Sequence, residues 1–145
     1  MLVKRAMSKN VVSVSVPGNR EKVLDLMRKE DKAVLPVVKG DTKQLVGLIT
    51  RSDLIVNPDE EQIAILMSTD LVTASPDDDV KDVAKKMIDN NVRRVPVVDD
   101  NGDLVGIITS FDLVSNALIK LESDDPVENF MITTVPTTWY KTPLN

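Results

Sequence analysis

The sequence predicts an α/β (α+β) protein made of two β-α-β-β-α units packed about a pseudo-twofold axis. The main observation is an internal repeat, in which residues 7–13 return as 67–73, residues 34–38 as 94–98, and residues 45–53 as 104–112. Such a repeat indicates one supersecondary unit used twice. The composition, 42% hydrophobic and 28% charged over 145 residues, is typical of a globular chain. Because one such unit has a thin core, we expect the two copies to pack together.

We place the first unit in residues 1–60 and the second in residues 61–121. Residues 122–145 are then a linker and the opening strand of a third unit, because Met-Ile-Thr-Thr-Val-Pro-Thr at 131–137 is similar to the start of the other two copies. A single opening strand would have no unit of its own to pack in, so we expect the natural chain to continue. The alternative is a tail that packs as a cap.

Each unit begins with a short strand, Val11–Val16 in the first copy and Leu71–Ala74 in the second, followed by a helix. In the second copy, Ser75 is the expected N-cap and Pro76 the expected first helical residue, where its missing N–H costs nothing. The acidic run 77–79 would then suit the positive end of the helix dipole.

The apolar spacing of this helix predicts one buried face, formed by Val80, Val83, Ala84 and Met87. In the first copy the same face is formed, less regularly, by Val23, Leu26 and Met27. Asn90-Asn91 can supply the left-handed residue that ends the second-copy helix.

Two apolar strands joined by a hairpin follow in each copy. The turn signals are Gly40-Asp41 and Asn101-Gly102, and the second strand is expected to end at Thr50 or Thr109. A closing helix follows, with Ser52 or Ser110 as the expected N-cap. Pro58 should stop it early in the first copy, whereas in the second it should run through Leu113, Leu118 and Ile119.

The composition excludes several function classes. The chain has no Cys and no His, so the usual ligands of zinc, iron and copper and the common nucleophile and general base are missing. The five glycines form no Gly-x-Gly, and no Gly-Lys pair exists, so both phosphate-loop fingerprints are absent. The acidic run 77–79 lacks the alternating spacing of an EF-hand. We therefore expect neither an enzyme nor a metal site.

Charge and hydropathy restrict the partners. No apolar run is long enough to cross a bilayer and the N-terminus has no signal-peptide pattern, so we expect a cytoplasmic protein with no membrane partner. Because the net charge is −5, we expect no nucleic-acid partner. Residues 1–60 carry a net charge of +3 and residues 61–145 one of −8. This difference is explained either by solvated helix faces or by attraction between unlike halves in a head-to-tail dimer.

The motif Gly-x-x-Thr-x-x-Asp occurs once in each copy, ending at Asp53 and Asp112. A small glycine would let a ligand approach the strand, and a carboxylate on the first helical turn can accept hydrogen bonds from a ribose diol. The alternative is structural: the aspartates complement the helix dipole, while Thr50 and Thr109 satisfy backbone groups.

The paired units, with their Leu-Pro-Val-Val or Val-Pro-Val-Val strand and their Gly-x-x-Thr-x-x-Asp strand end, resemble a tandem of CBS (cystathionine β-synthase) domains, a regulatory module of the Bateman type. The resemblance covers the chain through about Leu121. It implies two related clefts that commonly bind AMP, ADP, ATP or S-adenosylmethionine. It further implies that Asp53 and Asp112 hold ribose hydroxyls, with Thr50 and Thr109 near ribose or phosphate. Ser13 and Thr73 would line the clefts near the base.

The two copies differ before their Pro-containing strands. Arg93 and Arg94 stand in the second copy where Ala33 and Val34 stand in the first. Members of the resembled family that bind phosphorylated nucleotides often carry basic residues there, so we expect one cleft to bind phosphate more tightly. The alternative is a solvated or acid-paired surface. On the first side Arg51, which aligns with Ser110, could compensate.

Two function classes follow. The favoured one is a regulatory, ligand-sensing module that needs no cofactor for catalysis and binds an adenine nucleotide or S-adenosylmethionine. The alternative is an oligomerisation or interaction module with vestigial clefts. The apolar closing helices also predict a homodimer, because a second copy can cover the surface that they leave.

Overall fold

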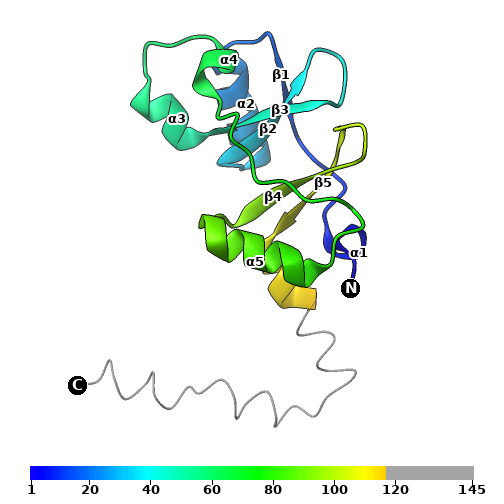
Figure 1. Ribbon diagram of the computed structural model, residues 1–145. Coiled ribbons are helices and arrows are strands. Elements are labelled where there is room, and N and C mark those ends of the chain that lie inside the picture. Colours follow the sequence, from blue (N-terminus) through cyan, green and yellow to red (C-terminus); the bar gives the residue numbers. More distant parts are fainter. Residues whose placement is uncertain (117–145) are drawn as a thin grey trace, which may run out of the picture. The chain divides into compact units, whose positions relative to one another are not determined.

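The computed structural model describes residues 1–116, and residues 1–110 form one compact unit. Its elements, labelled in Figure 1, are α1 (Val3–Ala6), β1 (Val14–Val16), α2 (Arg20–Glu30), β2 (Val34–Lys39), β3 (Leu45–Thr50), α3 (Arg51–Val56), α4 (Ile63–Leu66), α5 (Val80–Asn90), β4 (Arg94–Val98) and β5 (Leu104–Thr109). A further helix is described over residues 110–116. The proposed third unit and the end of the second closing helix, with Leu118 and Ile119, lie outside the described residues.

The first repeat contains a three-stranded sheet in the order β1-β2-β3. β1 is parallel to β2, with Val14 opposite Val37, and β2 and β3 form the predicted antiparallel hairpin. Gly40 in its turn has φ +53°, a left-handed conformation that glycine adopts without strain. β1 begins at Val14 rather than at Val11, so the first strand is shorter than predicted.

The second repeat has the same hairpin, β4 and β5, but its opening strand is reduced to one residue. Ala74 forms a single parallel bridge with Val97. The prediction of a strand over Leu71–Ala74 was therefore wrong. The pairing cannot extend, because the Ser75 N–H donates to Asp78 Oδ2 at 2.9 Å and Pro76 has no N–H. In the first repeat the matching residues Ser15 and Val16 pair with β2.

The prediction of Ser75 as N-cap and Pro76 as first helical residue was wrong. α5 begins at Val80, and its N-cap is Asp79, whose side chain accepts a hydrogen bond from the Lys81 N–H. The cause is long-range: the backbone of Pro76 accepts from the Lys4 N–H at 3.0 Å, and Val80 N–H donates to Met1 O at 3.0 Å. These bonds to Met1 and α1 hold residues 76–79 in a turn, so the helix starts only at Val80.

Helices α2 and α5 otherwise agree with the sequence prediction. Val23 and Met27 of α2 are buried, as are Val83 and Met87 of α5. Asn91 is the predicted left-handed C-cap of α5, with φ 53°, and Asp31 has the same conformation after α2. Both helices therefore end by the same device.

The closing helix of the first repeat, α3, is short as predicted and is followed by Pro58. Its N-cap is Thr50, whereas Ser52 lies inside the helix. In the second repeat Ser110 is likewise already helical. The predicted caps were therefore wrong, because the strand-ending Thr in the first repeat serves also as the cap and leaves no intervening loop.

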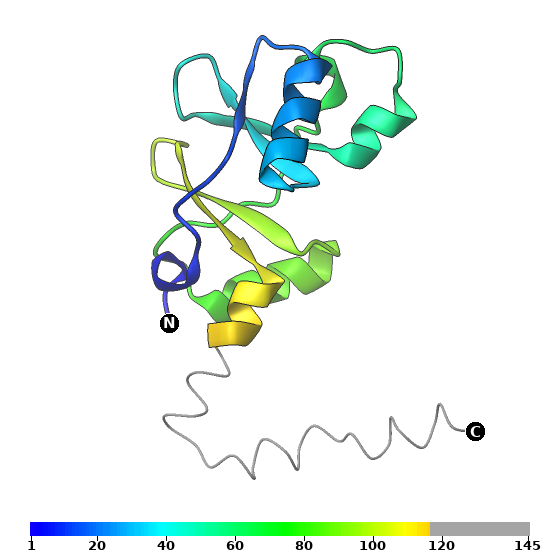
Figure 2. The same cartoon turned by 180° about the vertical axis from the view of Figure 1, so that it is seen from behind.

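The two repeats exchange their opening segments, as Figures 1 and 2 show. α1, at the N-terminus, contacts α5 and β5 of the second repeat. α4, which follows the first repeat, contributes Ile63 and Leu66 to the core of that repeat, together with Val23, Leu35 and Ile49. These two four-residue helices were not predicted. The exchange buries more apolar surface than either repeat could bury by itself.

Paired bridges confirm the predicted pseudo-twofold relation. Leu2 bridges Asp79, as Gln62 bridges Asn19. Gln44 bridges Asp103, its own counterpart in the repeat, so the axis passes between the two hairpin turns. Across it, the Leu45 N–H donates to Gly102 O at 3.1 Å, and the Leu104 N–H donates to Lys43 O at 2.8 Å. Within residues 1–116, no helix is long and apolar enough to span a bilayer.

Candidate ligand site

The motif of the first repeat ends in a capping box. Thr50 Oγ1 accepts a hydrogen bond from the Asp53 N–H at 3.1 Å, and Asp53 Oδ2 accepts one from the Thr50 N–H at 2.8 Å. Both residues are half-buried. Thr50 and Asp53 therefore satisfy backbone groups at the start of the helix, as the structural alternative predicts. Within residues 1–116 no protein group donates a hydrogen bond to Asp53 Oδ1, and the Thr50 hydroxyl proton can still donate.

The motif glycines do not leave room for a ligand. A Cβ at Gly47 would lie 2.7 Å from Met67 Sδ and 2.9 Å from the Ser68 carbonyl oxygen. A Cβ at Gly106 would lie 2.6 Å from Met7 Sδ and 2.9 Å from the carbonyl oxygen of Ser8. The opening segment of the other repeat occupies the space at each glycine. The expected role of these glycines in ligand approach was therefore wrong.

A cavity of about 290 Å³ opens between the repeats, and Ser13 lies in its wall. The first repeat contributes Val38 and the hairpin residues Thr42 and Lys43, and the second contributes apolar walls from β5. The described lining is Lys9, Val11, Ser13, Val38, Thr42, Lys43, Leu104 and Val105. The size lies near the lower end of the range for small-molecule sites, and the mixture of apolar walls with a few polar groups is typical of them.

A second, more open hollow of about 610 Å³ shares Lys9 and Val11 with this cavity. Its other described lining residues are Asn10, Val12, Glu30 and Lys32. It lies at the edge of the sheet where β1 and β2 begin and β3 ends, because Val34 is opposite Thr50 in the register. At the same edge, Arg51 donates to the Lys32 carbonyl oxygen at 3.2 Å.

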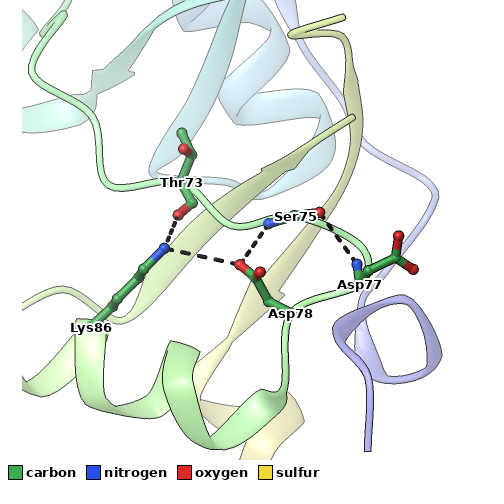
Figure 3. Close-up of polar contacts among 5 residues, drawn as sticks. All are labelled: Thr73, Ser75, Asp77, Asp78 and Lys86. Carbon is green, nitrogen blue, oxygen red and sulfur yellow. Dashed lines mark hydrogen bonds and ion pairs between the residues drawn. The ribbon is translucent and has the colours of Figure 1, made fainter. Parts of the chain in front are cut away.

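Thr73, the counterpart of Ser13, has a different environment, shown in Figure 3. Its carbonyl oxygen accepts a hydrogen bond from Lys86 Nζ at 2.9 Å, and the same ammonium lies 4.0 Å from Asp78 Oδ2. Ser75 completes this cluster through its N–H, bound to Asp78. The first repeat has Leu26 and Gly18 at the positions of Lys86 and Asp78, so it has no such cluster.

The structure brings Arg93 and Arg94 next to Thr109. Arg94 is opposite Thr109 in the β4–β5 register, and the Arg93 carbonyl oxygen accepts from the Ser110 N–H at 2.9 Å. Both arginine residues are exposed. Asp112 lies in the helix of residues 110–116, where its carbonyl oxygen accepts from Asn116 Nδ2 at 2.6 Å.

Sequence reasoning missed three basic residues of the first repeat: Lys9, Lys32 and Lys43 line the two hollows. The available signal was the comparison of the copies, since the matching residues in the second repeat are Thr69, Val92 and Gly102.

Two stretches, residues 3–59 and 61–119, match the CBS domain family. The chain belongs to the CBS domain family. CBS domain-containing protein YhcV of Bacillus subtilis is 30% identical over 133 residues, which are 88% of this chain and 93% of that protein. The crystal structure of the CBS domain pair of protein MJ0100, in complex with 5′-methylthioadenosine and S-adenosylmethionine, has 32% identity and a TM-score of 0.71. That likeness covers 79% of this chain and 98% of the other.

The CBS pair is also part of longer proteins. Inosine-5′-monophosphate dehydrogenase of Nitrosopumilus maritimus is 35% identical over 120 residues, which are 79% of this chain but 24% of that enzyme. The chain spans 43% and 44% of the lengths of two further curated relatives. The chain therefore spans less than half the length of these three relatives, one of which is an enzyme.

Proposed function

We propose that this CBS pair is a regulatory module that binds an adenosine-containing ligand, such as AMP, ADP, ATP or S-adenosylmethionine, between its repeats. The observation that carries the proposal is the cavity in which Ser13 of the first repeat faces β5 of the second. A ligand there touches both repeats at once, so its binding free energy can change their packing. The 32% identical CBS pair of MJ0100 holds two adenosine compounds, which supports this ligand class.

The motif residues are absent from the described lining of both hollows: Thr50 lies opposite Val34, at the end of the hairpin away from the cavity and next to the open hollow. We propose the motif residues as ribose contacts at that end. Asp53 keeps Oδ1 for a ribose hydroxyl while Oδ2 caps α3, and the capping box fixes the carboxylate in one orientation. In the second repeat we assign Asp112 to a ribose hydroxyl and Thr109 to ribose or phosphate, and we assign Ser13 and Thr73 positions near the base. We assign a phosphate to Arg93 and Arg94, and the position of Arg94 opposite Thr109 supports this assignment.

The test is a thermal-shift screen with adenosine, AMP, ATP and S-adenosylmethionine, followed by calorimetric titration. A ligand at a hundred times its Kd should stabilise the fold by about 2.7 kcal/mol. Asp112→Ala should then weaken binding by about 1.5–3 kcal/mol, because a charge-assisted contact is lost. Asp89→Ala, an exposed aspartate on α5, is the control. If no adenosine compound shifts the melting temperature, the chain is an interaction module with vestigial clefts.

We also propose that two copies associate through their closing helices. Ile55 and Val56 of α3 are 71% and 74% exposed, although both are large and apolar. A surface of this kind is costly in water and is commonly covered by a partner. The proposal concerns α3 of the first repeat and is independent of ligand binding.

A further inference from the structure

The opening strand of each repeat lies at an edge of its sheet, so one side of its backbone has no neighbouring strand. In the second repeat Ala74 faces β4, because its N–H donates to Pro96 O at 3.0 Å and its carbonyl oxygen accepts from the Val98 N–H at 2.9 Å. The N–H and C=O groups of alternate residues point to opposite sides of a strand, so those of Thr73 and Ser75 point away from β4. These two residues form the outer edge of the opening strand.

Two charged side chains close this outer edge in the second repeat, as Figure 3 shows. Lys86 Nζ donates to the Thr73 carbonyl oxygen at 2.9 Å, and Asp78 Oδ2 accepts from the Ser75 N–H at 2.9 Å. The ammonium and the carboxylate lie 4.0 Å apart, so their opposite charges favour this arrangement. The two backbone groups that the outer edge would offer to a ligand are therefore already occupied.

The first repeat leaves the same edge open. Its β1 pairs with β2 as Ala74 pairs with β4, so the backbone groups of Ser13 and Ser15 point away from β2. The counterparts of the lysine and the aspartate are Leu26, which packs against the core, and Gly18, which has no side chain. Within residues 1–116 no group donates a hydrogen bond to the Ser13 carbonyl oxygen, and Ser13 lies in the wall of the cavity between the repeats.

We infer that Lys86 determines which cleft of this chain binds a ligand more tightly: a ligand reaches the opening strand of the second repeat only after Lys86 has left Thr73. The first repeat requires no such displacement, so an adenosine compound binds its cleft more tightly. The inference rests on the proposed function and adds to it a specificity-determining residue that lies outside the repeated motif.

The size of the effect follows from the contacts of the lysine. The Lys86 side chain is 45% exposed, so water replaces part of its hydrogen bond when the ammonium leaves. We therefore expect a value at the lower end of the range for a hydrogen bond with a charged donor, which leaves Lys86 displaced in about one molecule in ten. The apparent affinity of a ligand falls with the fraction of molecules that can bind it, so the second cleft should be about tenfold weaker.

The experiment titrates adenosine and 5′-methylthioadenosine into the parent protein, Lys86→Leu, Lys85→Leu and Asp112→Ala. Both probes are uncharged, so the loss of a lysine does not alter a phosphate contact. Lys86→Leu gives the second repeat the residue of the first, and Lys85→Leu removes the same charge from the neighbouring exposed position of α5.

We expect two unequal sites in the parent. Lys86→Leu should tighten the weaker site about tenfold and leave the tighter one within twofold, and Lys85→Leu should change neither. Asp112→Ala should weaken the same site that Lys86→Leu tightens, because Asp112 is the proposed ribose contact of the second repeat. One site in the parent and two in Lys86→Leu would support the same conclusion, since a much weaker site escapes the titration.

The outcomes separate this inference from the proposed function. Two equal sites in the parent, a weaker site or a single site that Lys86→Leu leaves unchanged, or the same change in Lys85→Leu would overturn the role of Lys86 and leave the adenosine sites. A loss of the tighter site in Asp112→Ala would place the stronger cleft in the second repeat, which contradicts the inference. Binding of neither probe to any variant would overturn both, because Lys86→Leu is expected to bind.

Discussion

Gly47→Ala tests what the motif glycine does. A methyl group at this position would lie 2.7 Å from Met67 Sδ and 2.9 Å from the Ser68 carbonyl oxygen. The Met67 side chain can move away, but Ser68 cannot do so easily, because its backbone exchanges hydrogen bonds of 2.8 and 2.9 Å with Leu48. Overpacking of this kind costs about 1–3 kcal/mol. At roughly 4 °C per kcal/mol for a domain of this size, we expect the melting temperature to fall by about 4–12 °C.

The assays are thermal denaturation and urea denaturation, both followed by far-ultraviolet circular dichroism without ligand; the first gives the melting temperature and the second the free energy of unfolding. Gly40→Asn is the control, since Gly40 has φ +53° and nothing within 4 Å of a Cβ, and asparagine tolerates that conformation. We expect the control to stay within about 0.5 kcal/mol of the parent. If Gly47→Ala kept its stability but lost affinity for an adenosine ligand, the glycine would serve the ligand and our packing argument would be refuted.

Three further predictions concern stability and assembly. Arg20→Ala should lower the free energy of unfolding by about 2–3 kcal/mol, because the Arg20 guanidinium donates to the carbonyl oxygens of Leu54, Asn57 and Glu60 at 2.7–2.9 Å. The control is Arg28→Ala on the same helix. Arg28 has one exposed ion pair of 3.9 Å, so its loss should change the free energy of unfolding by less than about 0.5 kcal/mol. Lys86→Met removes the hydrogen bond from Lys86 Nζ to the Thr73 carbonyl oxygen, so amide hydrogen exchange near Thr73 should become faster. Lys85→Met is the control and should leave these rates unchanged. Equal rates in the two variants would mean that this hydrogen bond does not hold the backbone at Thr73. Ile55→Lys with Val56→Lys should shift sedimentation from dimer to monomer, and a parent that is monomeric at high concentration would rule out association through α3.

Local signals predicted those parts of the fold that local chemistry determines. The pair Asn90-Asn91 was predicted to supply the left-handed end of α5, and Asn91 does so. Thr50 was predicted as the end of β3, and it is. The start of α5 was missed, because Ser75 and Asp79 are both acceptable N-caps by sequence. Hydrogen bonds from α1, far away in the chain, decide between them.

The site shows the same limit. The repeated motif identified Asp53 and Thr50, and the resemblance to CBS domains identified Ser13. The structure places Ser13 in a cavity wall and the other two in a capping box. The sequence could not tell that Lys9 and Lys43 line one cavity, since they come from the opening segment and from the hairpin turn. The similarity of the two copies also could not show which copy each opening segment packs against, because the β2–β3 and β4–β5 hairpins have closely similar sequences.

The exchange of opening segments means that a repeat and a folding unit are different stretches of this chain. A fragment of residues 1–60 would lack Ile63 and Leu66, which complete its own core, while carrying an α1 whose binding surface on α5 and β5 is missing. Since β3 resembles β5, the α1 of one such fragment could take the place of α4 on a second fragment, and that second fragment could return the same contact. Half of this gene would then encode a symmetric dimer in which two chains trade their first residues, an arrangement from which duplication and fusion lead directly to the present chain.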